Sequence, residues 1–470
     1  MLDAVKGIES GGDGASIEAS SQPTHDADGR PTRLLPLGQV IKISLYWLGI
    51  SAVWSGILDI VNGRLQFTHI VPQGSEGMGA FQIALAGTFI AILVQPTVGT
   101  ISDYTITRWG RRKPYIFIGA TLDLVFLWGI ATSNSLTAVA AFVALLQFSS
   151  NFAQGPFQGY VPDLVPAEQV GLASGLLGLM AALGNVVGYG AAALALAYSQ
   201  TDPNAFFYGT MVIGVVEFLT MLSVVLSVQE GGRVKLRNGR SWFSIAREAW
   251  GTDILRERSF LWLVSSRFCI LTGAALYPIM ATFYLAQVFG LDAKATGDVK
   301  LVLLVVVGLC ITLSVVPASR LSDRIGRKKV IYGSCLAGGV GLGIGAVAPV
   351  LPVALVGAAI FAVGAGAFLA VDWALMSDIV PKASTGRYMG ISNVATASAG
   401  TVALALGGAA VMDTVNHFFG YGTGPRAALL LGVLLYVAGA VLLKPVVERR
   451  REDDATPAAA AAEVPMRSSW

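Results

Sequence analysis

The sequence contains few charged residues, few histidines and few cysteines. Only 13% of its 470 residues are charged and only 3 are histidines, whereas roughly a quarter of the residues of a soluble domain are charged. The 3 cysteines (Cys269, Cys310 and Cys335) stand inside apolar segments, without the spacing of a disulfide framework or a metal site. There is also no phosphate-binding loop and no nucleophile with a plausible base. These absences argue against a soluble enzyme, an ATP-driven pump and an intramembrane enzyme, and no cofactor is expected.

Long apolar runs dominate the chain instead. Hydrophobic residues make up 54% of the sequence, and the mean hydropathy is +0.65. Because one crossing of the hydrocarbon core takes about 20 apolar residues, these runs predict an all-α membrane protein. Twelve spans are expected, at about 38–62, 79–101, 113–132, 137–160, 169–197, 205–228, 259–288, 297–317, 329–348, 351–376, 388–412 and 427–446.

The basic residues predict the orientation of these spans. They cluster in the loops at 108–113, 233–258 and 320–329, which follow even-numbered spans, and such loops are retained in the cytoplasm. Both termini are therefore expected inside. The net charge of only +3, together with this clustering beside apolar runs, argues against nucleic acid and for the lipid bilayer as the partner.

Composition divides the chain into five segments. Residues 1–36, rich in Gly, Ser, Asp and Pro, and residues 449–470, a charge run followed by an alanine tract, are predicted to be disordered cytoplasmic tails. Residues 37–230 and 259–448 are predicted to be six-helix bundles. The cytoplasmic linker at 231–258 has apolar residues near helical spacing. This pattern leaves open whether it is a helix on the membrane surface or an ordinary linker.

Two motifs occur once in each half of the chain. The segment PDLVPAEQVGLASG, which contains Asp163, matches SDIVPKASTGRYMG, which contains Asp378. Earlier in each half, SDYTITRWGRRK from Ser102 matches SDRIGRKK from Ser322. The two motifs occur in the same order in both halves. The distance along the chain from the first copy to the second is nearly the same for both motifs, and it contains six spans. The halves are therefore predicted to be parallel repeats, as in major facilitator transporters.

The same motifs carry a closer resemblance. The stretch SD…RWGRRKPYIFIG from Ser102 resembles the signature loop of the glycoside and sucrose:cation symporter branch of the major facilitator superfamily. The stretch QGPFQGYVPDLVP from Gln154 resembles the fourth span of sucrose/proton symporters, with bacterial members most similar. The resemblance implies the major facilitator fold, with spans 1, 4, 7 and 10 around a central cavity and alternating access by rocking of the halves. It also implies a monomer in the plasma membrane, which in a bacterium is the inner membrane.

The sequence departs from the plant symporters at two positions of the fourth span. They place an Asp seven residues before the QGP sequence and an Arg two residues after its Pro, where this chain has Gln147 and Gln158. Proton coupling through that Asp therefore does not carry over, and sucrose does not follow as the substrate.

Substrate-binding candidates follow from the cavity-lining spans. Four amides on the fourth span have helical spacing and share one face. Amides donate and accept hydrogen bonds, which suits a polyhydroxylated ligand, although amides also join helices in membranes. Aromatic side chains on the first, seventh and tenth spans could stack on sugar faces. The candidates are Gln147, Asn151, Gln154, Gln158, Trp54, Tyr277 and Trp373.

Ionisable residues inside spans are costly and usually face a cavity or each other. Asp59, Arg267 and Asp372 lie on cavity-lining spans and are the proton-coupling candidates. Arg267 and Asp372 have similar depths and are predicted to pair. The resemblance places Asp123 and Glu217 on peripheral spans, where a structural role, by pairing or interhelical hydrogen bonding, is favoured over a transport role.

Charges at the ends of the spans are the gating candidates, because carboxylates there stand beside Arg-rich loops. They are Asp103, Arg111, Arg112, Asp163, Asp323, Arg324, Arg327 and Asp378.

Together these features predict a secondary active transporter, a proton-coupled symporter for a disaccharide or glycoside. An exporter or facilitator of another small polar solute remains open, as does a membrane scaffold or assembly factor on the same fold.

Overall fold

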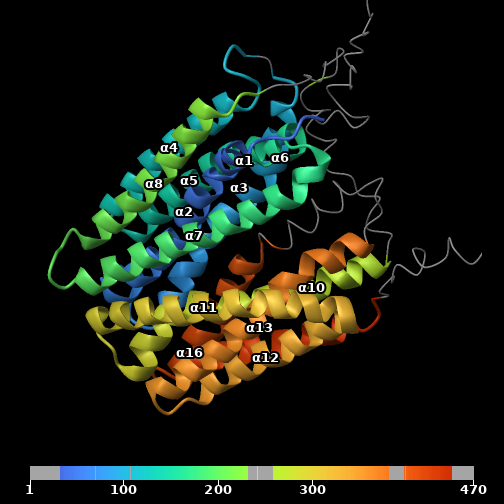
Figure 1. Ribbon diagram of the computed structural model, residues 1–470. Helices are drawn as coiled ribbons and strands as arrows, with labels where there is room; N and C mark the ends of the chain where they lie inside the picture. The colour runs from blue at the N-terminus through green and yellow to red at the C-terminus, as the bar shows by residue number, and fades with distance from the viewer. Residues whose placement is uncertain are drawn as a thin grey trace, which may run out of the picture.

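The computed structural model describes residues 32–68, 70–105, 107–230, 241, 258–379, 396 and 398–446, and within these ranges it contains helices and no strand. Figure 1 shows the helices in two groups, blue to green for the N-terminal half and yellow to red for the C-terminal half. The N-terminal half contains α1 (Leu37–Ser44), α2 (Tyr46–Phe67), α3 (Glu76–Ser102), α4 (Lys113–Thr132), α5 (Leu136–Gln158), α6 (Tyr160–Leu164), η1 (Ala167–Gln169), α7 (Val170–Tyr198) and α8 (Ala205–Ser227). The C-terminal half contains α10 (Arg258–Phe289), α11 (Ala293–Ile325), α12 (Arg327–Val347), α13 (Leu351–Ile379), the π-helix η4 (Leu404–Asp413), α15 (Thr414–Phe419) and α16 (Gly424–Leu443).

Twelve helices are long and apolar enough to cross a membrane, which confirms the predicted number of spans. Two predicted spans end earlier than the helices that correspond to them. The eighth, expected at 297–317, is the much longer α11, whose N-terminus is capped by Asp292 accepting a hydrogen bond from the Ala295 backbone N–H at 2.7 Å. The eleventh, expected at 388–412, runs over Ser398–Phe419. Its predicted first residues lie outside the described part of the chain.

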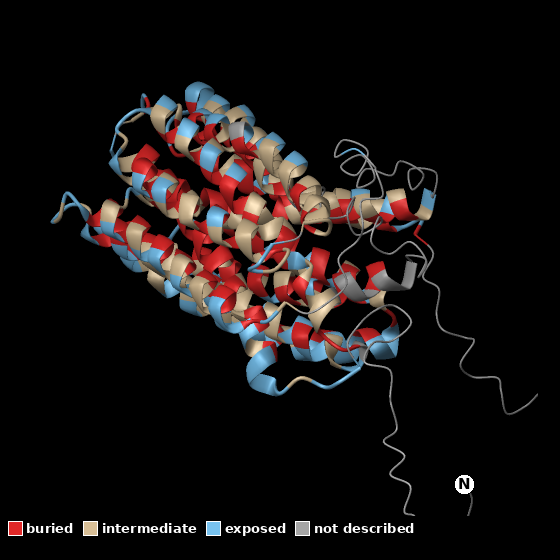
Figure 2. Cartoon of the chain, turned by 90° about the horizontal axis from the view of Figure 1, so that it is seen from above, coloured by how far each residue is buried: buried red, intermediate tan, exposed pale blue. Residues whose placement is uncertain are grey.

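Large apolar side chains cover the outer surface of the bundle. Leu313, Leu336 and Val347 are each at least two-thirds exposed, whereas Asp123, Glu217 and many other polar residues are buried. Figure 2 shows the buried residues running through the middle of the bundle and the exposed ones on its outward faces and loops. This inverted arrangement suits a hydrocarbon solvent, in which apolar groups face out and polar groups find partners inside.

Glycine allows neighbouring helices in each half to pack closely. A Cβ added to Gly188 of α7 would overlap Ser55 and the Ala52 backbone of α2, and one added to Gly341 of α12 would overlap the Phe361 backbone of α13. Small residues permit such contacts between membrane helices. In lipid there is no hydrophobic driving force between helices, so their association depends on van der Waals packing.

The two halves meet at one end of the bundle. We call the end with the basic loops the inner end and the opposite end the outer end. Gly77 at the start of α3 touches Gly408 of η4, and Gly297 near the start of α11 touches Ala193 and Ala197 near the end of α7. All of these residues are at the outer end. In Figure 1 the halves correspondingly approach each other on the side away from the grey segments.

The folded N-terminal half begins before its predicted boundary at residue 37. Leu35, expected in the disordered arm, exchanges two hydrogen bonds with the Gln169 side chain, at 2.8 and 2.9 Å, and so belongs to the folded half. The predicted linker at 231–258 lies almost entirely outside the described residues, as do the outermost parts of both tails.

Candidate functional site

The polar face predicted on the fourth span is present on α5. Ser135 begins this helix by accepting a hydrogen bond from the Ala138 backbone N–H, and Pro156 lies in its last turn. Asn151 is 3% exposed and donates to the backbone oxygen of Gln147 at 2.7 Å and to its side-chain oxygen at 3.1 Å. Gly87 of α3 leaves the room that the Gln147 side chain occupies.

The other two amides of this face are at least partly exposed. Gln154 is half-buried and Gln158 is exposed. Within the described ranges, no residue forms a hydrogen bond with either side-chain amide. An amide without a protein partner offers one acceptor and two donors, the groups that hydroxyls of a sugar need.

The three aromatic candidates have different surroundings. Trp54 of α2 is half-buried and packs against an apolar cluster that contains residues of both halves. Tyr277 of α10 stacks on Phe361 of α13, with ring centroids 4.6 Å apart, and lines a small apolar pocket inside the C-terminal half with Tyr284 and Gly341. Trp373 lies on α13, but its side chain is outside the described set.

Arg267 of α10 and Asp372 of α13 form the ion pair that the sequence predicted. The Arg267 Nε lies 2.9 Å from the Asp372 Oδ2, and the side chains are only 3% and 5% exposed. The pair lies within the C-terminal half, among the apolar residues Ile270, Val371 and Leu375. It therefore joins two predicted cavity-lining helices of the same half.

Asp59 also has a basic partner, which the sequence did not identify. The Lys300 Nζ of α11 donates to Asp59 Oδ1 and, at 2.6 Å, to the hydroxyl of Thr282 on α10. Asp59 is 5% and Lys300 is 9% exposed. Lys300 lies three residues after the predicted start of the eighth span. The Asp59–Lys300 pair links the two halves.

Further hydrogen bonds link the halves at the outer end. Asn62 donates to the Ile279 backbone oxygen at 3.2 Å. Gln287 donates to Gln66 at 2.9 Å and accepts from Asn416 at 2.9 Å. The Asp413 carboxylate accepts from the backbone N–H groups that begin α3, those of Gly77 at 3.1 Å and Met78 at 2.7 Å. An anion is favoured at such a helix N-terminus.

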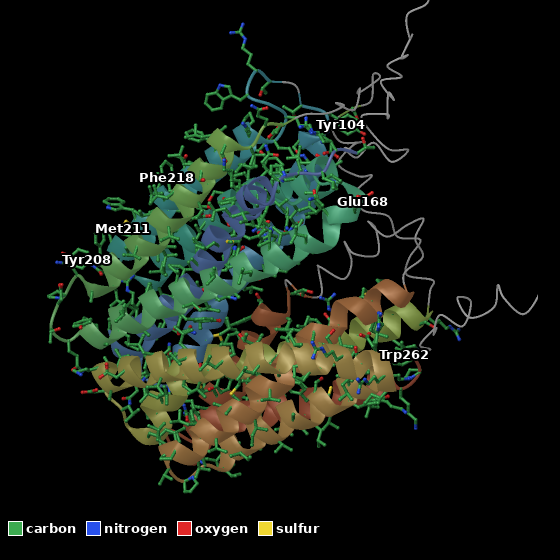
Figure 3. The ribbon with its side chains drawn as sticks, in the orientation of Figure 1. Tyr104, Glu168, Tyr208, Met211, Phe218 and Trp262 are labelled. Carbon is green, nitrogen blue, oxygen red and sulfur yellow. The ribbon has the colours of Figure 1, made fainter. Side chains whose placement is uncertain are left out.

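A second charge cluster lies at the inner end of the N-terminal half, near Tyr104 and Glu168 in Figure 3. Arg112, 5% exposed, has Nη2 2.8 Å from Asp103 Oδ1 and 2.7 Å from Asp163 Oδ2. Arg111 also pairs with Asp163. The Arg112 Nη1 donates to the Pro156 backbone oxygen at 2.7 Å, so the cluster is attached to the end of α5. Four predicted gating residues are thus brought together.

Glu230 completes this cluster and was missed in the sequence. Its carboxylate accepts from the backbone N–H groups of Arg111, Arg112 and Lys113, at 2.6, 3.0 and 2.8 Å, where α4 begins. It also accepts from the Tyr160 hydroxyl at 2.7 Å. Burial and the adjacent Glu230 carboxylate raise the pKa of Tyr160, which keeps that hydroxyl a donor.

The corresponding charges of the C-terminal half are differently placed. Asp323 and Arg324 are exposed on the last turn of α11, with no ion pair to another described residue, and Arg327 is half-buried at the start of α12. Asp378 lies near the end of α13, but its side chain is not among those described. Beside Arg327, the Lys328 ammonium donates hydrogen bonds to the Lys444 and Val446 backbone oxygens, both at 2.7 Å.

Comparison with known proteins identifies the family. A profile of the MFS/sugar transport protein family matches residues 77–447, which is most of the chain. This chain belongs to that family. It is accordingly a multi-pass membrane transporter and not an enzyme.

Individual relatives are more distant. The sucrose transport protein SUT1 of Oryza sativa subsp. japonica is 27% identical over 177 residues, which cover 33% of this chain and 32% of that protein. The sucrose transport protein SUC3 of Arabidopsis thaliana is 27% identical over 209 residues, which cover 39% and 34%. The matches thus span about a third of the length of these relatives.

Solved structures share the fold. A D-xylose-proton symporter superposes with a TM-score of 0.62 at 18% identity, over 87% of this chain and 97% of its own. A nucleoside transporter superposes with a TM-score of 0.62 at 14% identity, over 87% of this chain and all of its own. At these identities the likeness establishes the major facilitator fold alone.

Proposed function

We propose that this protein is a proton-coupled sugar symporter that works by alternating access, and that it acts as a monomer in the plasma membrane with both termini in the cytoplasm. The observation that carries the proposal is the polar face of α5, where the amides of Gln154 and Gln158 have no partner among the described residues. A family of sugar transporters and relatives named as sucrose transport proteins support a sugar as the ligand.

The contacts between the halves support alternating access. Described contacts join the halves at the outer end, through Asp59–Lys300, Gln66–Gln287 and Asp413 on α3. Among the described residues, the ion pairs of the inner-end cluster around Arg112 join helices of the N-terminal half. With the basic loops in the cytoplasm, this state is closed to the outside. Transport then requires these outer contacts to separate, together with the apolar cluster that contains Ile57 of α2 and Ile279 and Phe283 of α10.

Proton coupling is assigned to the carboxylates that these contacts hold. Asp59 is the stronger candidate, because protonation would remove its charge and with it the attraction to Lys300 that holds the outer end closed. Asp372 faces Arg267 within one half and is assigned to linking the two helices rather than to carrying the proton.

Uptake into proteoliposomes tests the proposal. Labelled disaccharides, glycosides, monosaccharides and nucleosides are offered with and without an imposed acidic exterior. A sugar is expected to accumulate only with the gradient. Gln154→Leu should then reduce its uptake at least tenfold, whereas Asn134→Ala, which removes an exposed amide from the loop before α5, should not. Uptake independent of the gradient would indicate a facilitator, and no transport of any offered solute by folded protein would favour a scaffold.

A further inference from the structure

Two acidic residues face each other inside the N-terminal half. Asp123 of α4 and Glu217 of α8 are both 0% exposed, and their carboxyl groups lie within hydrogen-bonding distance of each other. Tyr208, Met211 and Phe218 mark the course of α8 in Figure 3. The sequence predicted a structural role for this pair, and the proposed transport cycle does not use it.

Two glycines bring the surrounding helices up to this pair. Gly119, one turn before Asp123, touches the Ser149 backbone oxygen and Ala153 of α5. Gly49 of α2 touches the backbone and side chain of Glu217. Because a Cβ at either glycine would overlap these atoms, the close approach of α2, α4, α5 and α8 is built into the sequence.

The hydrogen bonds leave one oxygen of each carboxyl without a donor. The Ser149 hydroxyl donates to Asp123 Oδ1, and the Tyr46 hydroxyl lies 3.4 Å from Glu217 Oε1. Asp123 Oδ2 and Glu217 Oε2 are fully buried, and no donor among the described residues reaches them. A proton held between the two carboxyls would supply a donor that these helices do not provide.

No described basic side chain forms an ion pair with either carboxyl. On the packed helices, the titratable group that faces it is Tyr46, and α5 contributes only Ser149. The cation of α2, Arg64, donates instead to the Ile130 backbone oxygen at the far end of α4. Neither α5 nor α8 contains a Lys, Arg or His. Two ionised carboxylates in contact at a buried site repel strongly, so one of them must be neutral.

We propose that Asp123 and Glu217 share one bound proton, and that this pair is a proton-binding site of the N-terminal half separate from the polar face of α5. Ser149 joins the site to α5. It lies two residues from both Gln147 and Asn151, and residues two apart point to opposite sides of a helix, so Ser149 is on the side opposite the polar face. The bound proton thus fixes the position of the helix that presents the amides. Only this last link rests on the proposed transport of a sugar.

Infrared spectroscopy of the purified protein in lipid vesicles, without substrate, tests the site. Wild type should show the carbonyl stretch of a protonated carboxylic acid at neutral pH, and the band should disappear as the pH is raised. The double variant Asp123→Asn with Glu217→Gln should lose the intensity of one carboxylic acid. The control Asp298→Asn, at an exposed ion pair with Lys294, should keep it. An unchanged band in the double variant would overturn the proposal.

Thermal unfolding at different pH gives a second readout. The folded pair binds a proton that the unfolded chain releases near neutrality, so the melting temperature of wild type should fall as the pH rises through the titration of the pair. In Asp123→Asn the amide N–H replaces the shared proton, and this fall should be reduced. An equally steep fall in Asp123→Asn and wild type would contradict a shared proton. Both readouts are independent of transport, so failure of the uptake experiment leaves them standing.

Discussion

The buried ion pair between Arg267 and Asp372 allows the most quantitative prediction. Both side chains are at most 5% exposed, and their atoms are 2.9 Å apart. Removing one partner of such a pair leaves an uncompensated buried charge and costs about 3–5 kcal/mol, whereas replacing both partners with neutral groups is often close to neutral. We therefore expect Arg267→Met and Asp372→Asn each to destabilise the protein by about 3–5 kcal/mol. The double variant should be more stable than either single variant.

Equilibrium unfolding in mixed micelles measures the four free energies of this cycle. The coupling energy should reach about 2 kcal/mol or more, because the two residues are in contact and each buried charge neutralises the other. The pair Lys294–Asp298 is the matched control, since its side chains are 63% and 53% exposed one helical turn apart. The same double-mutant cycle there should give about 0.5 kcal/mol or less.

One result would refute this reasoning. If the double variant Arg267→Met with Asp372→Asn is as unstable as the worse single variant, the two charges do not compensate each other. The stability of this region would then come from the apolar packing around the pair.

Three further predictions concern the two ends of the bundle. Asp59→Asn should abolish accumulation driven by a pH gradient but retain exchange of labelled sugar, because the amide mimics the protonated acid; retained accumulation would reject Asp59 as the proton site. Gly159→Ala should lower folded yield and transport, because the new methyl group would overlap the Arg112 guanidinium, and normal activity would show that the inner-end cluster adapts freely. Cysteines placed at Arg108 and at Lys329 should resist an impermeant external reagent in intact cells, and their labelling would reverse the proposed orientation.

The twelve spans could be predicted because hydrophobic length is a local property. A bilayer of fixed thickness demands about 20 apolar residues wherever a helix crosses. The motifs that occur once in each half, such as those that begin at Ser102 and Ser322, then predicted the symmetry of the halves. The errors occurred where a local signal was weak. Lys294 precedes the apolar run and Arg320, Asp323 and Arg324 follow it, so the predicted span stopped short of both ends of α11.

The site could be predicted only where helical spacing brings residues together. The amides of α5 share a face because they are three and four residues apart, and Arg267 and Asp372 were paired from their similar depth. Glu230 and Asn416 could not be identified in this way. Glu230 binds the first backbone N–H groups of α4, and Asn416 bonds Gln287 across a helix contact. Such contacts depend on tertiary packing, which leaves no periodic mark in the sequence.

The buried charges divide the proposed mechanism between the halves. The Asp123–Glu217 pair and the Arg267–Asp372 pair each lie within one half, so rocking of rigid halves leaves their geometry unchanged. The Asp59–Lys300 pair crosses between the halves and must separate whenever the outer end opens. Of these three pairs, therefore, only Asp59–Lys300 forms and breaks with the conformational change of the proposed cycle. A proton on Asp123–Glu217 can influence that state only by shifting helices within its half, through Ser149 and α5, which is the helix that offers its amides to the sugar.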